Sequence, residues 1–327
     1  MRYLVTGGAG YVGSHLVAEI RDRGGEVVVV DNFVTGHRDA VLPGVRLVEG
    51  DVGDAATLQA ALAFGPFEAV FHFAARSLVG ESMRDPMLYF RENVGKGAIL
   101  IDSCVRGGVR KFVFSSTAAL FGVPGEGPIG ETAPIAPVSV YGESKAMIER
   151  MLAWAGRVHG LRGACLRYFN AAGADAAGRL GEDHRPETHL IPLAIDAALG
   201  RRPPLEVFGT DFPTPDGTCI RDYIHVADLA DAHLRVLTRL DAGSVAYNLG
   251  TGRGHSVLEV LRAVEAVGGR AVPHCLAGRR AGDPANLVAS SARIAAETGW
   301  APRRAALEAI VASAWAWRVA HPDGFAA

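Results

Sequence analysis

Apolar and polar residues alternate along the first half of the chain in blocks that predict strands followed by helices. Short apolar runs bounded by glycine or polar residues are typical of buried strands, and several segments between them carry apolar residues at helical spacing. Strands are expected at 2–6, 27–31, 46–49, 69–73, 111–115 and 163–167, and helices ending near 23, at 55–63, at 86–106 and around 141. This alternation predicts a parallel sheet covered by helices on both faces.

The pattern changes past Gly173. Residues 173–188 are rich in glycine, alanine and charged residues and predict a loop into a second, smaller lobe. That lobe is expected to contain elements near 190–199, 205–208 and 305–321. We therefore expect a doubly wound α/β domain over 1–172 and a smaller C-terminal α/β substrate lobe over 173–327. Residues 222–250 read as strand, helix and strand and are candidates to return to the first domain.

A glycine-rich turn follows the first expected strand. Gly7, Gly10 and Gly13 recur at every third residue between this strand and an apolar-periodic helix. Such glycines let the backbone approach a pyrophosphate closely, and the helix N-terminus supplies free N–H groups. Asp31 ends the next strand, where a carboxylate binds both hydroxyls of an adenosine ribose and repels a 2′-phosphate. The context predicts a Rossmann-type site for NAD; the alternative is a glycine-rich turn without a ligand.

A tyrosine and a lysine at helical spacing are the second chemical signal. Tyr141 and Lys145 are four residues apart, which places them on one face of a helix. A free tyrosine titrates near ~10, too high for a base at neutral pH, and a nearby cation lowers the pKa of the phenol. The pair therefore predicts an oxygen base that accepts a proton from an alcohol.

Composition and charge narrow the class of protein. The chain has 327 residues, of which 49% are hydrophobic and 21% charged, as expected for a globular core. The formal net charge of −2 gives no reason to expect binding to nucleic acid or to a membrane surface. No apolar run approaches the ~20 residues of a membrane span, and the N-terminus enters a strand without a signal peptide. A cytoplasmic protein is expected.

Cysteine and histidine positions show no pattern typical of metal or disulfide sites. Cys104, Cys165, Cys219 and Cys275 are widely separated and are expected to be reduced thiols. No HExxH or comparable ligand cluster appears among the histidines, so no metal site is expected.

Longer motifs connect the chain to a known family. The most specific runs from Phe208 through Val226 and reads FGTDFPTPDGTCIRDYIHV. Shorter ones are found at Gly80–Ser82, Ser115–Thr117, Arg167–Asn170 and Arg279–Asp283. With the glycine turn and the Tyr-x-x-x-Lys pair in place, the chain resembles the extended short-chain dehydrogenase/reductase family over essentially its whole length. Within that family it is most similar to the 4-epimerases of UDP-sugars.

The resemblance implies a role for individual residues. The residues expected to bind NAD are Gly7, Gly10, Tyr11, Val12, Gly13, Asp31, Asn32, Asp51, Val52, Phe73, Ala74, Asn93, Ser115, Tyr141, Lys145 and Tyr168. Those expected to bind the nucleotide sugar are Thr117, Asn170, Leu190, Phe208, Arg221, Tyr223, Arg280, Asp283 and Leu287. Thr117, Tyr141 and Lys145 are the expected catalytic residues. An alternative for Arg221 is a surface ion pair with Asp222.

The resemblance also implies an activity. It is the interconversion of UDP-glucose and UDP-galactose by NAD-dependent oxidation at C4, rotation of the 4-keto sugar and re-reduction on the other face. Alternatives are 4-epimerisation of a UDP-linked N-acetylhexosamine, pentose or uronate, and a non-catalytic NAD-binding sensor. A 4,6-dehydratase is disfavoured, because Ala118 and Ala119 stand where those enzymes carry Asp-Glu after the threonine. A homodimer is expected through the helix at 86–106 and the Tyr141 helix.

Overall fold

A seven-stranded parallel sheet forms the centre of the larger lobe in the computed structural model, which describes residues 1–122, 125, 127–280 and 283–325. The strand order is β10-β6-β5-β4-β1-β2-β3, so the direction of winding reverses between β1 and β4. Ligands of such sheets bind at the carboxyl ends of the strands beside this reversal. The strands are β1 (Arg2–Thr6), β2 (Glu26–Asp31), β3 (Arg46–Glu49), β4 (Ala69–His72), β5 (Lys111–Thr117), β6 (Arg162–Tyr168) and β10 (Val245–Leu249).

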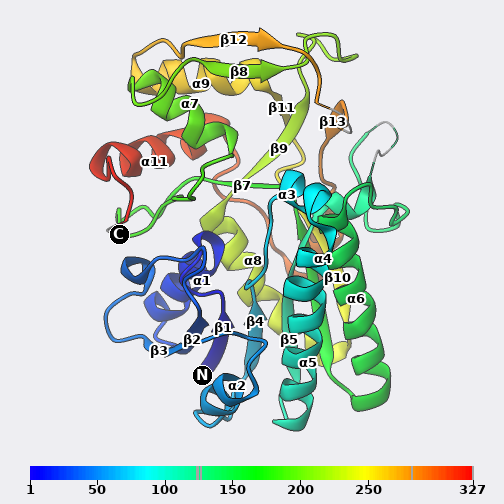
Figure 1. The fold of residues 1–327 in the computed structure, drawn as a ribbon. Helices are drawn as coiled ribbons and strands as arrows, with labels where there is room; N and C mark the ends of the chain where they lie inside the picture. Colours follow the sequence, from blue (N-terminus) through cyan, green and yellow to red (C-terminus); the bar gives the residue numbers. More distant parts are fainter. Residues whose placement is uncertain (123–124, 126, 281–282, 326–327) are drawn as a thin grey trace.

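Helices cover both faces of this sheet (Figure 1). One face packs against α1 (Tyr11–Asp22), α8 (Val226–Arg239) and α10 (Ala292–Thr298). The other packs against α2 (Ala55–Leu62), α5 (Lys96–Arg106) and α6 (Val140–His159). Shorter helical segments are η1 (Arg38–Ala40), α3 (Val79–Arg84), α4 (Pro86–Tyr89), η2 (Phe90–Gly95), η3 (Ala118–Phe121) and η4 (Leu240–Ala242). In the described part of the chain, no helix combines the length and apolar character needed to cross a membrane.

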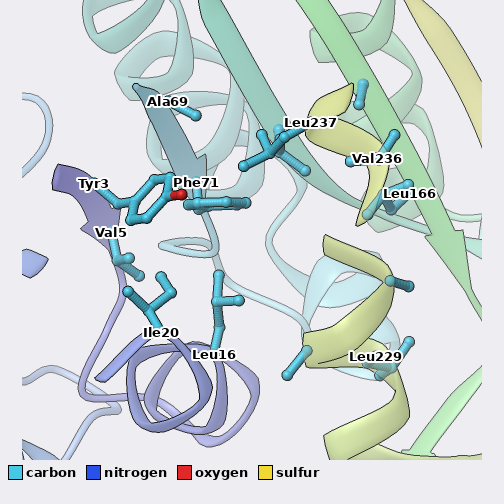
Figure 2. Packing of buried hydrophobic residues seen from close by; sticks show 14 of the residues in the cluster. Tyr3, Val5, Leu16, Ile20, Ala69, Phe71, Leu166, Leu229, Val236 and Leu237 are labelled. Carbon is cyan, nitrogen blue, oxygen red and sulfur yellow. The ribbon is translucent and has the colours of Figure 1, made fainter. Parts of the chain in front are cut away.

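Successive residues of a strand pack alternately into the two hydrophobic cores on either side of the sheet. Tyr3 and Val5 of β1 face α1 and α8, whereas Leu4 between them belongs to the opposite cluster. Figure 2 shows Tyr3 and Phe71 of the sheet with Leu16 and Ile20 of α1. Both faces of the strands are therefore apolar, which explains the continuous hydrophobic runs in the sequence.

A smaller lobe stands above the carboxyl ends of the large sheet (Figure 1). Its main sheet has β9 between β11 and β13, with β7 also paired to β9, and a separate pair joins β8 and β12. The helices α7, α9 and α11 pack against these strands around their own core. The elements are β7 (Asn170–Ala172), α7 (Leu190–Ala198), β8 (Leu205–Phe208), β9 (Ile220–His225), β11 (Gly254–Ser256), α9 (Val257–Gly268), β12 (His274–Ala277), β13 (Asn286–Leu287) and α11 (Leu307–Ala320).

Two details differ from the sequence-based expectation. The helix expected at 86–106 consists of α4, the π-helical turn η2 and α5, and such turns often occur at functional sites. Of the segment 222–250, α8 packs on α1 and β10 joins the large sheet beside β6, but β9 belongs to the smaller lobe. The chain thus returns to the larger lobe one element later than expected.

Candidate active site

The glycine turn joins β1 to α1 at the carboxyl end of the large sheet. Gly7 has φ +75°, and a Cβ there would lie 2.4 Å from the backbone nitrogen of Ala74, so only glycine fits. A Cβ at Gly13 would lie 2.1 Å from the carbonyl oxygen of Gly7, so this glycine lets α1 pack against the turn. The helix begins after Gly10 without a side-chain cap. Its first N–H groups are thus available to an anion.

Asp31 lies at the end of β2, and its carboxylate is hydrogen-bonded to the same turn. It accepts hydrogen bonds from the backbone N–H groups of Ala9 and Phe33, both at 2.9 Å. Its side chain is buried, which raises the pKa of the carboxyl group, and these backbone bonds act in the opposite direction. Asn32 next to it donates to Asp51 at 2.8 Å. Asn32 therefore connects Asp31, the residue expected at the ribose, to Asp51, the residue expected beside the adenine.

A groove with a cavity of about 100 Å³ runs over the turn, and its lining fits NAD. Predicted residues that line it are Gly7, Gly10, Asp31, Asn32, Asp51, Val52, Phe73 and Ala74. Lys96 also lines it, a residue that the motifs did not indicate; its ammonium group lies 2.7 Å from both Asp51 and Glu92. Uncapped N–H groups at one end and a buried carboxylate at the other match a pyrophosphate and a ribose diol.

The other predicted cofactor residues surround this groove. Tyr11 and Val12 lie in the first turn of α1, where the Tyr11 hydroxyl donates to the carbonyl of Gly173 at 2.6 Å and Val12 packs on the core. Tyr168 and Ser115 share a hydrogen bond between their hydroxyl groups at the ends of β6 and β5. A further predicted residue, buried in η2, is Asn93. Its side chain bonds both backbone polar groups of Arg76 and thereby holds the loop after Phe73 and Ala74.

The three predicted catalytic residues converge on the ends of β5 and α6. Lys145 is buried, and its Nζ donates to the carbonyl of Ser115 at 2.9 Å. The same Nζ lies 5.9 Å from the centre of the Tyr141 ring. Ser139 caps α6 by accepting from the Gly142 N–H at 3.2 Å, which fixes the start of the helix. Thr117 ends β5 next to the phenol and influences its titration.

Burial dominates the titration of the tyrosine and the lysine. It raises the pKa of the Tyr141 phenol, while the Thr117 side chain acts in the opposite direction. It lowers the pKa of Lys145 to about 7. The sequence-based expectation of a phenol pKa lowered by Lys145 is therefore not met by the protein side chains alone. At neutral pH a buried ammonium near its titration point contributes only part of a charge.

A second cavity, of about 250 Å³, lies in the smaller lobe beside this site. Predicted substrate residues that line it are Asn170, Leu190, Phe208, Arg221, Tyr223 and Arg280. Asn170 begins β7 two residues after Tyr168 ends β6, so one short segment connects the end of the large sheet to this cavity. The guanidinium group of Arg280 lies 4.9 Å from the centre of the Phe208 ring, a cation–π arrangement at the rim.

Arg221 is positioned by backbone groups. It donates to the carbonyls of Ile220 and Pro284 at 2.8 and 2.9 Å. Asp283 lies 3.8 Å from Arg221 and accepts from Arg280 at 3.0 Å, so this carboxylate stands between two cations. The alternative of an Asp222 pair is wrong, because that buried carboxylate is bound by residues on other elements: the N–H groups of Thr251, Gly252 and Ala289.

Comparison with known proteins shows the family. The model of the NAD dependent epimerase/dehydratase family matches residues 3–250. The chain belongs to this family. It is 51% identical over 318 residues to a UDP-glucose 4-epimerase of Azospirillum brasilense, covering 97% of this chain and 91% of that protein.

Solved structures of other family members have the same fold. UDP-glucose 4-epimerase from Brucella ovis in complex with NAD is 46% identical, with a TM-score of 0.93 over 96% of this chain and 97% of that one. The Bifidobacterium longum enzyme in complex with NAD⁺ and UDP is 36% identical, with a TM-score of 0.94 over 99% and 100% of the two chains.

This epimerase/dehydratase family member also carries a cluster that the sequence analysis missed. Glu182, His184, Glu187 and His189 bring one ligand atom each to within 4.8 Å of one another, beside the substrate cavity. The chain contains no HExxH motif, so no metal site was expected. The signal was the loop spacing Glu-x-His-x-x-Glu-x-His, in which residues two or three apart converge because the chain turns.

Proposed function

We infer that this chain is an enzyme that interconverts UDP-glucose and UDP-galactose with NAD as its cofactor. Its relatives over nearly the full length are UDP-glucose 4-epimerases, and structures of such relatives contain NAD. The observation that supports the inference best is the strand register at the end of the large sheet: Thr117 of β5 is opposite Tyr168 of β6, two residues before Asn170 of the cavity lined by Arg221. Another UDP-sugar or a non-catalytic sensor role is not favoured.

For the chemistry at C4, we propose that Tyr141 takes the proton of the sugar 4-hydroxyl and returns it after inversion. Bound NAD supplies the hydride acceptor and donor for this carbon. Thr117 orients the 4-oxygen, and a positioned base of this kind contributes ~10²–10⁴ in rate. Lys145 positions the cofactor side of the site and favours the phenolate when it is charged. The carbonyl of Ser115 orients its ammonium group.

For binding, we propose that the nucleotide half is held firmly and the hexose loosely. Arg221 and Arg280 supply positive charge for the diphosphate. Phe208, Leu190 and Tyr223 supply apolar and aromatic surface, and Asn170 supplies an amide. Asp283 orients both arginines. A hexose with few polar anchors turns about its diphosphate link between the two half-reactions, so either face of C4 is presented to the same cofactor.

We further propose that the two lobes bind different ligands. Residues 1–172, together with α8 and β10, bind NAD, and the remainder of 173–327 binds the nucleotide sugar. We also propose a cytoplasmic location, where a reducing environment keeps Cys104, Cys165, Cys219 and Cys275 as the free thiols described.

A homodimer is proposed from the surface of the larger lobe. The helices α3, α4, α5 and α6 lie together (Figure 1) and expose large apolar side chains. Those more than 40% exposed are Val79, Met83, Met87, Ile99, Trp154 and Val158. Leu100 and Leu152 lie on the same helices but are buried in the core and take no part in this surface. Large apolar side chains exposed on neighbouring helices are the kind of surface that protein–protein contacts cover.

The inferred activity is tested by direct product analysis. Purified protein is incubated with UDP-galactose alone, and the products are separated by anion exchange and identified by NMR. The expected result is an equilibrium mixture of UDP-galactose and UDP-glucose without net consumption of added NAD. Unchanged UDP-galactose, with tight NAD binding retained, would contradict catalysis and favour the sensor role.

A further inference from the structure

The loop from the larger lobe into α7 gathers four potential metal ligands within eight residues. Glu182, His184, Glu187 and His189 belong to the segment 182–189, which ends where α7 begins. Their ligand atoms all lie within 4.8 Å of one another. None of the four is among the residues assigned to the chemistry at C4.

Four separations between nitrogen and oxygen atoms of the cluster are close to those of a tetrahedral metal site. His189 Nδ1 lies 3.0 Å from Glu182 Oε1 and 2.9 Å from Glu187 Oε1. His184 Nδ1 lies 3.5 Å from both carboxylates. Ligand atoms ~2.0–2.1 Å from a tetrahedral zinc ion are about 3.3 Å apart, close to these values. These four nitrogen–oxygen separations are therefore compatible with a metal ion held between the side chains.

Two buried atoms of the cluster have no hydrogen-bond partner within the described chain. They are His184 Nδ1 and Glu187 Oε2, and the Glu187 side chain is only 9% exposed. Buried polar atoms are almost always satisfied, so each such atom requires an explanation. A hydrogen bond between these two would close to about 2.9 Å, whereas they stand 3.5 Å apart. A cation held by both accounts for the gap and for both unpaired atoms.

We propose that these four side chains form a binding site for a divalent transition-metal ion, with zinc the best match. Two imidazole nitrogens and two carboxylate oxygens are ligands that zinc accepts, and without sulfur the set does not favour a cuprous ion. Four protein ligands leave no open position for water or substrate, so the site is structural.

The position of the site indicates what the ion would stabilise. Glu182 and His189 line the substrate cavity, and His189 directly precedes Leu190, the first residue of α7. The ring of His184 lies 6.1 Å from that of Tyr11 at the start of α1, edge to face. The ion would thus clamp a loop that packs on Tyr11, beside the glycine turn of one lobe, and also lines the cavity of the other lobe.

The test uses the full chain, purified without a histidine tag and without added chelator. Zinc is measured by mass spectrometry, and chelator-treated protein is titrated with zinc chloride against a chromophoric competitor. We expect one zinc per chain. His184→Ala and Glu187→Gln should each weaken zinc binding by more than about 100-fold, since even residues behind the ligands change affinity 10–100-fold. His159→Ala, on an exposed histidine outside the cluster, should bind as the wild type does.

X-ray absorption at the zinc edge supplies a readout that needs no variant. The expected coordination is two nitrogen and two oxygen atoms at about 2.0–2.2 Å. Sulfur in that shell would overturn the proposal, as would wild-type affinity in the folded His184→Ala and Glu187→Gln proteins. Wild-type protein that shows neither stoichiometric zinc nor a tight site in the titration would overturn it as well. If a variant fails to fold by circular dichroism, the absorption spectrum decides alone.

Discussion

The ammonium group of Lys145 lies 5.9 Å from the centre of the Tyr141 ring and donates its hydrogen bond to the carbonyl of Ser115. Both side chains stand on α6, four residues apart, as the sequence spacing predicts. The ammonium group is close enough to influence the pKa of the Tyr141 phenol. It is not placed to accept a proton in place of that phenol. Proton transfer and positioning are therefore separable by mutation.

Replacement of Tyr141 by phenylalanine removes the proposed proton acceptor and little else. The substitution leaves Thr117 and the residues that line the two cavities unchanged, so binding of NAD and UDP-sugar should persist. Turnover of UDP-galactose should fall by ~10²–10⁴. Steady-state rates and calorimetric titration with UDP check both parts. Tyr3→Phe is the control and should keep normal turnover, because the Tyr3 hydroxyl donates to the Met1 sulfur at the start of β1. Near-normal turnover in Tyr141→Phe would refute the base assignment.

Lys145→Met should change the pH dependence of stability in a defined direction. Burial lowers the pKa of Lys145 from 10.5 to about 7, so between these values the unfolded chain binds the extra proton. The wild type therefore gains stability as pH rises from 7 to 10.5, and Lys145→Met lacks this gain. The stability of the variant relative to wild type should fall by roughly 4 kcal/mol across that window. Denaturant unfolding at a series of pH values measures it.

Lys111→Met is the control for that experiment. Burial acts to lower the pKa of Lys111, but Asp241 and Glu68 outweigh it and raise the value above 10.5. The contribution of Lys111 is thus fully present below 10.5 and lost only above it. The stability difference of this variant should stay flat between pH 7 and 10. If the stability difference between Lys145→Met and wild type also stayed constant over this pH range, burial would not lower the pKa of Lys145.

Asp31 should set the choice between NAD and NADP. Its buried carboxylate is held by the Ala9 and Phe33 N–H groups at the groove, where a 2′-phosphate would meet a fixed negative charge. Protein reconstituted with NAD should be active, and protein reconstituted with NADP should not. Asp31→Asn should reduce the ratio of activity with NAD to activity with NADP. Asp39→Asn, which changes an exposed carboxylate of η1, should leave this ratio unchanged. Equal activity with both cofactors in the wild type would contradict this role.

Ile99 should contribute to the proposed dimer interface. Its side chain is 41% exposed on α5, within the apolar surface of α3 to α6. Light scattering at micromolar concentration should give twice the chain mass for the wild type, and Ile99→Glu should shift it toward the monomer. Val319→Glu, on a residue of α11 that is 48% exposed and remote from this surface, should leave the mass unchanged. A monomeric wild type would exclude the dimer.

The parts of the molecule that depend on local sequence patterns could be predicted from the sequence. Strands of the large sheet are apolar on both faces, and the motifs around Gly7 and Tyr141 are short, so both could be read directly. The strands β11 and β13 were missed because they have three and two residues and pair only through β9, far away in the chain. The raised pKa of Tyr141 was missed because burial depends on packing from several elements. The cluster at 182–189 was missed because no regular element spaces its ligands.

Leu287 should determine how well N-acetyl sugars are accepted. We propose from the family resemblance that this residue is a gate beside the C2 substituent of the sugar. In the structure, Leu287 of β13 lies opposite Arg221 of β9. The residue thus neighbours a side chain of the substrate cavity without lining it itself. A leucine is intermediate in bulk, and a methylene-scale change in a pocket discriminates by ~1–3 kcal/mol. UDP-glucose and UDP-galactose should be good substrates, and UDP-N-acetylglucosamine a poor one.

Leu287→Ser should raise the rate with UDP-N-acetylglucosamine relative to UDP-glucose by about 10-fold or more, within the range of one such pocket change. The ratio of kcat/KM for the two sugars is the measurement, because it cancels any general loss of activity. Leu276→Ser, on a residue of β12 that is 65% exposed, should leave the ratio unchanged. If the wild type turns over both sugars equally, or if the serine variant gains nothing relative to the control, then Leu287 does not gate the space beside C2. In that case the gate belongs to a residue that lines the cavity directly.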